Sequence, residues 1–259
     1  MRRTTTTLTL AVALGLFMTL PALAQDADSL IVQGKRMMAA GLNAADLDQV
    51  REARTLFERA TNDDHRAAWA HYYVAQVDNN LANLLAEHDK GEAVDHLDSA
   101  IEHLKAALER EESAEAYALL ASVYGRKIGL KPLLGMFLGP KAGKALNQAK
   151  TLDPDNPRVV LTEAVSDFNT PKMFGGSKTR AVEGLARAIG LFEQEEVADP
   201  LLPRWGHAQA YAWLGIAYQD QGDTAAAHRA FEQALEVNPD FGWVKYVLLP
   251  GLDDEAGSK

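Results

Sequence analysis

Apolar residues recur every three or four positions through most of the chain, which is the spacing of one face of an α-helix. The clearest stretch runs from Ala208 to Pro239 and is divided near Gly222 into two periodic segments. Its apolar positions are Tyr211, Leu214, Gly215 and Tyr218 in the first segment, and Ala227, Phe231 and Ala234 in the second. Small residues at fixed positions let two helices approach closely, and a proline ends a helix. The pattern predicts two antiparallel helices joined by a short turn.

The same arrangement recurs upstream with changes in length. One copy has Tyr117, Leu120, Ala121 and Tyr124 in its first helix, then Ala142, Leu146, Ala149 and Pro154. An earlier copy comes after a second-helix pattern formed by Ala53, Phe57 and Ala60. Its own first helix has His71, Val74 and Ala75, and its second helix has Ala100, Leu104 and Ala107. Its second half arrives late, which predicts that both helices of this pair are about two turns longer than usual. A weaker copy begins at Val160 and ends at Ala188.

On these residues the chain resembles the tetratricopeptide-repeat family over roughly residues 28–250. The resemblance implies an all-α fold, a helical solenoid of about five helix pairs in which each pair contacts its neighbours. The apolar segment 241–249 is expected to form a C-terminal capping helix, and the alternative is a segment that docks on a partner. We therefore predict one solenoid domain over residues 25–250 and a disordered tail over residues 251–259.

The first 24 residues have a different pattern. A basic start precedes a stretch that is almost wholly apolar from Leu8 to Leu20, and residues 22–24 place small side chains where signal peptidase cleaves. We interpret residues 1–24 as a cleaved signal peptide that leaves Gln25 as the N-terminus. A membrane anchor or a buried helix is the alternative. This interpretation predicts a periplasmic or secreted protein with no stable membrane insertion after cleavage.

Composition narrows the range of partners. The chain carries 26 Lys and Arg against 36 Asp and Glu, a formal net charge of −10. That sign repels nucleic-acid backbones and anionic lipid surfaces, which proteins bind mainly through Lys and Arg. Because no cysteine is present, the sequence excludes disulfides, thiolate metal sites and cysteine nucleophiles. We expect no nucleic-acid partner.

The sequence offers little for catalysis. His96 and His103 are seven residues apart on one predicted helix, about 10 Å by the helix rise, which is too far to share a metal ion. We interpret them as part of a solvated charged face. The sequence has no H-E-x-x-H, G-x-S-x-G or Walker-type phosphate motif. We expect a protein that is not an enzyme, with no catalytic residues, no metal site and no cofactor.

The family resemblance also implies a binding surface, the concave face formed by the first helix of each pair. Carried over residue by residue, this face gives a partner-binding groove of eight residues: Tyr72, Gln76, Asn79, Asn80, Asn83, Arg126, Arg158 and Asn169. Amides on such a helix face can donate to and accept from a peptide backbone. The alternative is an inter-helix hydrogen-bond network or a plain solvated face.

Two insertions lengthen the repeats, near residues 127–141 and 169–177. The first is apolar, and its glycines and prolines predict an irregular loop that either folds back onto the solenoid or lines a partner site. The second is expected to be a connecting turn, and the alternative is an anion site at the start of the next helix.

These observations favour a non-enzymatic protein- or peptide-binding scaffold of the bacterial cell envelope. The alternative is a periplasmic binder of a hydrophobic small molecule, because the chain also resembles transport-associated repeat proteins. In that case an apolar cavity would be lined by Leu134, Met136 and Phe137.

Overall fold

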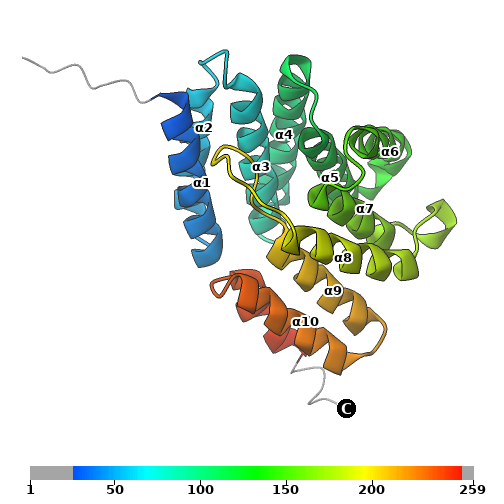
Figure 1. Ribbon diagram of the computed structural model, residues 1–259. Coiled ribbons are helices and arrows are strands. Elements are labelled where there is room, and N and C mark those ends of the chain that lie inside the picture. The colour runs from blue at the N-terminus through cyan, green and yellow to red at the C-terminus, as the bar shows by residue number, and fades with distance from the viewer. Residues whose placement is uncertain (1–25, 253–259) are drawn as a thin grey trace, which may run out of the picture.

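The computed structural model describes residues 26–252 as a chain of helices without a β-strand (Figure 1). Within this range ten α-helices form five successive antiparallel pairs. They are α1 (Ala27–Ala44), α2 (Leu47–Ala60), α3 (Ala67–Leu85), α4 (Lys90–Arg110), α5 (Ala114–Leu130), α6 (Gly135–Leu152), α7 (Pro157–Asn169), α8 (Lys178–Glu193), α9 (His207–Asp220) and α10 (Thr224–Val237). The predicted all-α solenoid of about five helix pairs is confirmed. The predicted signal peptide lies outside the described residues.

Short polar side chains start most of these helices. At seven N-termini the side chain of the preceding residue accepts a hydrogen bond from a backbone N–H of the first turn: Asp26, Asp46, Asp89, Ser113, Asn156, Ser177 and Asp223. Each bond satisfies a donor that has no partner inside the helix. The start of each of these helices is therefore determined locally.

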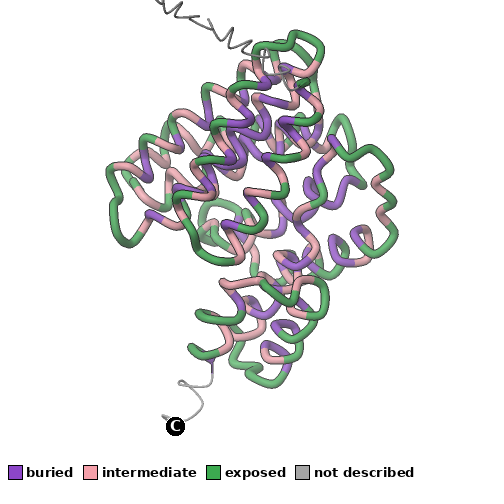
Figure 2. The backbone as a smooth tube through the Cα atoms, turned by 90° about the vertical axis from the view of Figure 1, so that its left-hand side faces the viewer, coloured by how far each residue is buried: buried purple, intermediate pink, exposed green. Residues whose placement is uncertain are grey.

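Within a pair, a large side chain of one helix lies against a small residue of the other. A Cβ atom added at Gly215 of α9 would lie 2.3 Å from Cε1 of Phe231 in α10, so glycine alone fits there. The first pair repeats the arrangement with Gly34 and Phe57, where the corresponding distance is 2.6 Å. Buried residues accordingly lie between the helices, while the turns are exposed (Figure 2).

The second pair is longer than the last one, as its late apolar pattern predicted. Helices α3 and α4 have 19 and 21 residues, whereas α9 and α10 have 14 each. The late position of α4 therefore comes from a longer α3 and not from a longer connection.

The C-terminal end of the solenoid is covered by its own helix. Residues 242–252 are helical and include the π-helix η3 (Val244–Leu248). Val244 and Leu252 are buried in one cluster with Phe231 and Ala234 of α10, which confirms the predicted capping helix. This helix includes residues 251 and 252, the first two of the predicted tail, and the rest of that tail lies outside the described residues.

The two ends of the solenoid also touch. The side-chain amide of Asn238, just after α10, donates to Oδ1 of Asn43 in α1 at 3.3 Å. The end of α10 accordingly approaches the C-terminal end of α1 in Figure 1. The five pairs therefore curve far enough for the first repeat to meet the last.

Candidate binding site on the concave face

The predicted groove residues on α3 are more buried than their pattern indicated. Tyr72, Gln76 and Asn79 are all buried, Asn80 is half-buried and Asn83 is exposed. The prediction that Tyr72 faces a ligand groove is wrong, because another segment of the chain covers its side chain.

The covering segment is the long connection between α8 and α9, residues 194–206, which we call the strap. In Figure 1 it leaves the end of α8 and reaches back over the inner side of α1 and α3. Leu201 of the strap is buried in the same apolar cluster as Tyr72 and Tyr73. The strap therefore occupies part of the concave face.

Side-chain donors of the concave face hold the strap by its backbone carbonyl groups. The hydroxyl of Tyr73 donates to the Leu201 carbonyl at 2.5 Å. The ammonium group of Lys35 in α1 donates to the carbonyls of Pro200 and Leu202, each at 2.5 Å. Burial, together with the charges of nearby arginines, lowers the pKa of Lys35 to about 8.

Arg158 holds the strap at two further points, residues 195 and 203. Its guanidinium is 2% exposed and forms a two-point ion pair with Glu195, with N–O distances of 2.5 and 3.0 Å. It also donates to the carbonyl of Pro203 at 2.8 Å. Arg158, predicted to contact a partner, is therefore committed to contacts within the chain, because a guanidinium this deeply buried needs a carboxylate beside it.

Beyond the strap, three predicted residues come together near the end of α3. Arg126 of α5 donates to Oδ1 of Asn79 at 2.9 Å and to Oδ1 of Asn83 at 2.6 Å. Within residues 26–252 no carboxylate lies within ion-pair distance of this guanidinium. Burial lowers the pKa of Arg126 to about 10, which leaves it charged at neutral pH.

This cluster of Asn79, Asn83 and Arg126, which we call the amide–arginine cluster, offers donors. Because both amide oxygens accept from Arg126, both amide NH₂ groups are left as donors, along with the second terminal nitrogen of the guanidinium. The hydrogen bonds of the described chain supply no acceptor for these three groups. A ligand for the cluster therefore needs hydrogen-bond acceptors, such as carbonyl or carboxylate oxygens.

The remaining predicted groove residues lie apart from this cluster. The amide of Asn80 points to the sulfur of Met38 in α1 at 3.7 Å. Asn169 is exposed at the end of α7 and donates to the carbonyl of Val165 in its own helix. The buried Oε1 of Gln76 has no hydrogen-bond partner among the described residues.

The predicted irregular apolar loop is instead mostly helix. The short 3₁₀-helix η1 (Pro132–Leu134) leads directly into α6, which starts at Gly135 and passes through Pro140. Leu134 is half-buried, whereas Met136 is 84% and Phe137 68% exposed. The expectation that Met136 and Phe137 fold back onto the solenoid is wrong, because both side chains are exposed, and for the same reason they do not enclose a cavity. The alternative, that the segment lines a partner site, stays a prediction.

The histidines of α4 do not lie on a solvated face, so that interpretation is also wrong. His96 contacts the fully buried carboxylate of Asp78 at 2.7 Å. Burial alone would raise the pKa of Asp78, but hydrogen bonds from His96, Arg54 and Ser99 outweigh it and lower the pKa. His103 meets His71 of α3, with 2.8 Å between their Nδ1 atoms.

Neither a metal site nor a membrane-spanning helix is formed by residues 26–252. No group of three or more His, Asp or Glu side chains in this range is arranged to hold a metal ion. None of the described helices has the length and apolar character needed to cross a bilayer.

The strap is the part of the site that sequence reasoning missed. Its signal is a connection between helices that contains Pro200 and Pro203 yet also carries Leu201, Leu202 and Trp205. Apolar side chains in an otherwise polar connection indicate that it is covered by another part of the chain.

Comparison with known proteins agrees with this architecture. Residues 208–241 match the family model described as Tetratricopeptide repeat. The chain is similar to the HusA haemophore from Porphyromonas gingivalis, with a TM-score of 0.61 and 22% identity, over 78% of this chain and 96% of that one. It is also similar to a thermophilic TPR protein of Thermus thermophilus, with a TM-score of 0.58 and 19% identity, over 90% and 97% of the two chains. No curated protein sequence matches the chain.

Proposed function

We propose that this chain, which has the repeat and the fold of tetratricopeptide-repeat proteins, is a non-enzymatic scaffold that binds a protein or peptide on its concave face. The observation that carries the proposal is the amide–arginine cluster of Asn79, Asn83 and Arg126. A charged guanidinium without a carboxylate, beside two amide NH₂ groups, suits a partner that presents oxygen acceptors. A peptide presents backbone carbonyls at regular intervals.

The strap supports this mode of binding. Lys35 and Tyr73 already hold an irregular segment of the chain by three successive backbone carbonyls, at residues 200–202. The concave face therefore has the chemistry to bind a backbone without reading its side chains. A partner peptide would continue this binding at the end of α3, where the strap makes no hydrogen bond.

We further propose that the protein acts in the bacterial cell envelope, either in the periplasm or after secretion. The basic start, the apolar core and the small residues 22–24 support this location. The intact mass of the protein recovered from the periplasm or the medium should correspond to a chain that begins at Gln25. A recovered chain that retains Met1 would contradict the proposal.

A second candidate function is the binding of a hydrophobic small molecule. The observation in its favour is the shared fold with the HusA haemophore, which is covered over 96% of its length. Against it, Met136 and Phe137 are exposed and do not line an enclosed cavity. Native mass spectrometry of the purified protein separates the two functions, because a retained small ligand would add a fixed mass.

The scaffold proposal is tested by selecting peptides from a random displayed library on the purified protein. Binding of an enriched peptide is then compared between wild type and the double variant Asn79→Ala with Asn83→Ala. Loss of hydrogen bonds at an occupied interface costs about 1–3 kcal/mol, so affinity should fall roughly 5- to 150-fold.

The matched control replaces an exposed amide on the outer side of the same region, Gln148→Ala in α6. It should leave affinity unchanged, and circular dichroism should show both variants folded. A library that yields no binding peptide, or a peptide that binds the double variant as tightly as wild type, would contradict the scaffold proposal.

A further inference from the structure

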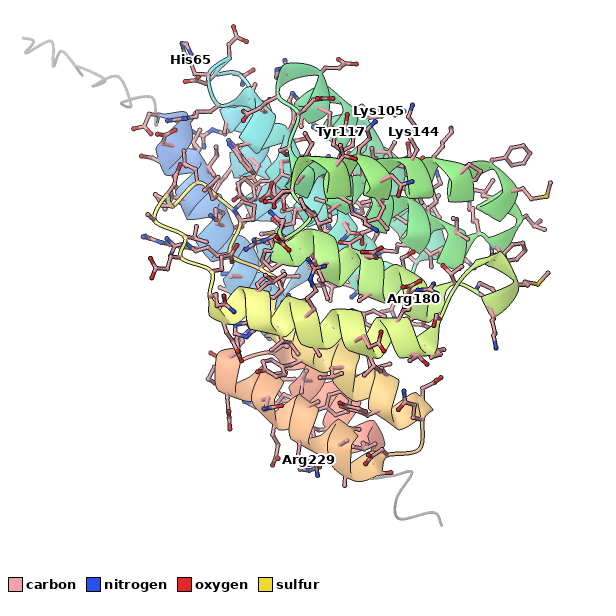
Figure 3. The ribbon with its side chains drawn as sticks, turned by 45° about the vertical axis from the view of Figure 1, so that its right-hand side comes forward. His65, Lys105, Tyr117, Lys144, Arg180 and Arg229 are labelled. Carbon is pink, nitrogen blue, oxygen red and sulfur yellow. The ribbon has the colours of Figure 1, made fainter. Side chains whose placement is uncertain are left out.

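Two turns protrude side by side at one edge of the solenoid (Figures 1 and 3). The first consists of η1 and the start of α6, and the second is the 3₁₀-helix η2 (Lys172–Phe174) between α7 and α8. Both connect the two helices of a pair, and the pairs are neighbours because α5 packs on α7. We call the two together the tip surface. None of its residues belongs to the strap or to the amide–arginine cluster.

The tip surface concentrates exposed apolar side chains. Five of the nine large apolar side chains exposed in residues 26–252 belong to it: Leu133 (92% exposed), Met136 (84%), Phe137 (68%), Met173 (83%) and Phe174 (72%). Single exposed apolar residues are normal, but a cluster of this kind marks an interaction site.

The second turn is held in a fixed shape. Gly175 has φ of 97°, and a Cβ at Gly176 would lie 1.7 Å from the carbonyl oxygen of Thr170. Arg180, labelled in Figure 3, donates to the carbonyl of Gly175 at 2.5 Å and pairs with Asp167. The exposed Met173 and Phe174 are therefore presented by a braced turn.

The same surface is basic although the whole chain is acidic. Residues 116–152 and 168–182 contain no Asp or Glu, in a chain whose net charge is −10. Lys131, Lys141 and Lys172 are exposed at the two turns, and no ion pair within residues 26–252 involves them. Nearby acids are already paired, Asp98 with Lys127 and Asp167 with Arg180.

We propose that the tip surface docks on an anionic lipid bilayer, with the five apolar side chains in the headgroup–acyl boundary and the lysines at the lipid charges. Each lysine near such a surface is attracted to the lipid charges, and this attraction acts within a Debye length of about 8–10 Å. The net negative charge elsewhere on the chain is therefore screened.

A lipid surface fits these features better than a protein partner. The apolar side chains stand on two separate protrusions, so a protein would need two sockets at a matching distance. A bilayer interface admits protruding side chains at any spacing. The docking is peripheral, in keeping with the lack of a membrane-spanning helix among the described residues.

The test is flotation of the chain without residues 1–24, which retains every helix described, with vesicles of phosphatidylcholine containing about 30% or no phosphatidylglycerol. Wild type should float with the anionic vesicles and much less with the neutral ones. The quadruple variant Met136→Ser, Phe137→Ser, Met173→Ser and Phe174→Ser should bind at least about tenfold more weakly. Replacing Lys131, Lys141 and Lys172 with Gln should remove the preference for anionic lipid.

The matched control is Tyr246→Ser with Val247→Ser, which removes two exposed apolar side chains from the capping helix. It should bind vesicles as wild type does. Failure of wild type to float with anionic vesicles, or equal flotation of wild type and the quadruple variant, overturns the proposal. If wild type floats with neither vesicle type but captures a protein of the cell envelope, the proposal is overturned in favour of a protein partner.

Discussion

The indole Nε1 of Trp205 donates to the hydroxyl of Tyr72 at 2.9 Å, across 133 positions of the sequence. This contact joins the end of the strap to α3 of the second repeat. The concave face of the protein is therefore partly filled by its own chain, and any ligand must bind beside the strap or displace it.

Replacing Trp205 with Phe should loosen the strap. The fully buried hydroxyl of Tyr72 would lose its donor, which costs about 1–3 kcal/mol of unfolding free energy. Urea unfolding measures this loss, and hydrogen exchange of residues 196–205 should become faster. Trp213→Phe is the control, because the Trp213 ring lies against Phe168 and Trp243, away from the strap. Equal exchange of the strap in both variants would contradict this prediction.

Removing the carboxylate of Glu195 should destabilise the protein more than removing the carboxylate of the next residue, Glu196. Glu195→Ala leaves the buried guanidinium of Arg158 without its ion-pair partner. The expected loss is about 2–4 kcal/mol, below the largest values for buried pairs because Glu195 keeps some contact with solvent. Glu196→Ala, at an exposed position, should change the midpoint of urea unfolding very little. Similar midpoints for both variants would show that the pair is not an anchor.

Two glycine-to-alanine changes should act in opposite directions. Gly215→Ala places a Cβ against the ring of Phe231 and should cost about 1–3 kcal/mol. Gly190→Ala in α8 has nothing within 4 Å of the new Cβ and should add up to about 1 kcal/mol of stability. Thermal melting of the two variants, measured side by side, checks both signs. A stabilised Gly215→Ala variant would mean that α9 and α10 are not in the contact described.

Stability should fall as the pH is lowered from about 6.5 towards 5. Burial, followed by the neighbouring His103, lowers the pKa of His71 to about 4, and burial also lowers that of His103. The unfolded chain therefore binds more protons than the folded one between about pH 6.5 and 4, so the free energy of unfolding decreases as the pH falls. His71→Gln should flatten this slope, whereas His65→Gln, at an exposed histidine, should not. Parallel slopes in the two variants would refute this assignment.

The sequence predicted the helix pairs, because the residues that form each pair lie close together along the chain. The spacing of Tyr211, Gly215 and Phe231 identified α9 and α10 because the two helices of a pair touch within about 30 positions of each other. The repeat pattern also places Arg126 and Asn79 on the same concave face, so the sequence could predict that these two residues lie near each other. The contact of Trp205 with Tyr72 has no such pattern, because nothing periodic relates the connection between the fourth and fifth pairs to a helix of the second pair.

The failed prediction for Met136 and Phe137 has a different cause. Glycine and proline usually interrupt helices, but Pro140 lies in the second turn of α6, where its missing N–H removes one hydrogen bond and the helix continues. The segment was expected to bury its apolar side chains because exposed clusters are unfavourable. Their exposure became visible once the two turns were placed side by side in space.

The contact between Asn43 and Asn238 changes how the molecule can deform. A solenoid whose ends do not touch can bend and extend along its whole length, because each repeat contacts only its neighbours. Here the two ends are fastened by an amide hydrogen bond worth about 0.5–1.5 kcal/mol. Because so little free energy holds this contact, we expect the two ends of the solenoid to separate more readily than the two helices of any pair.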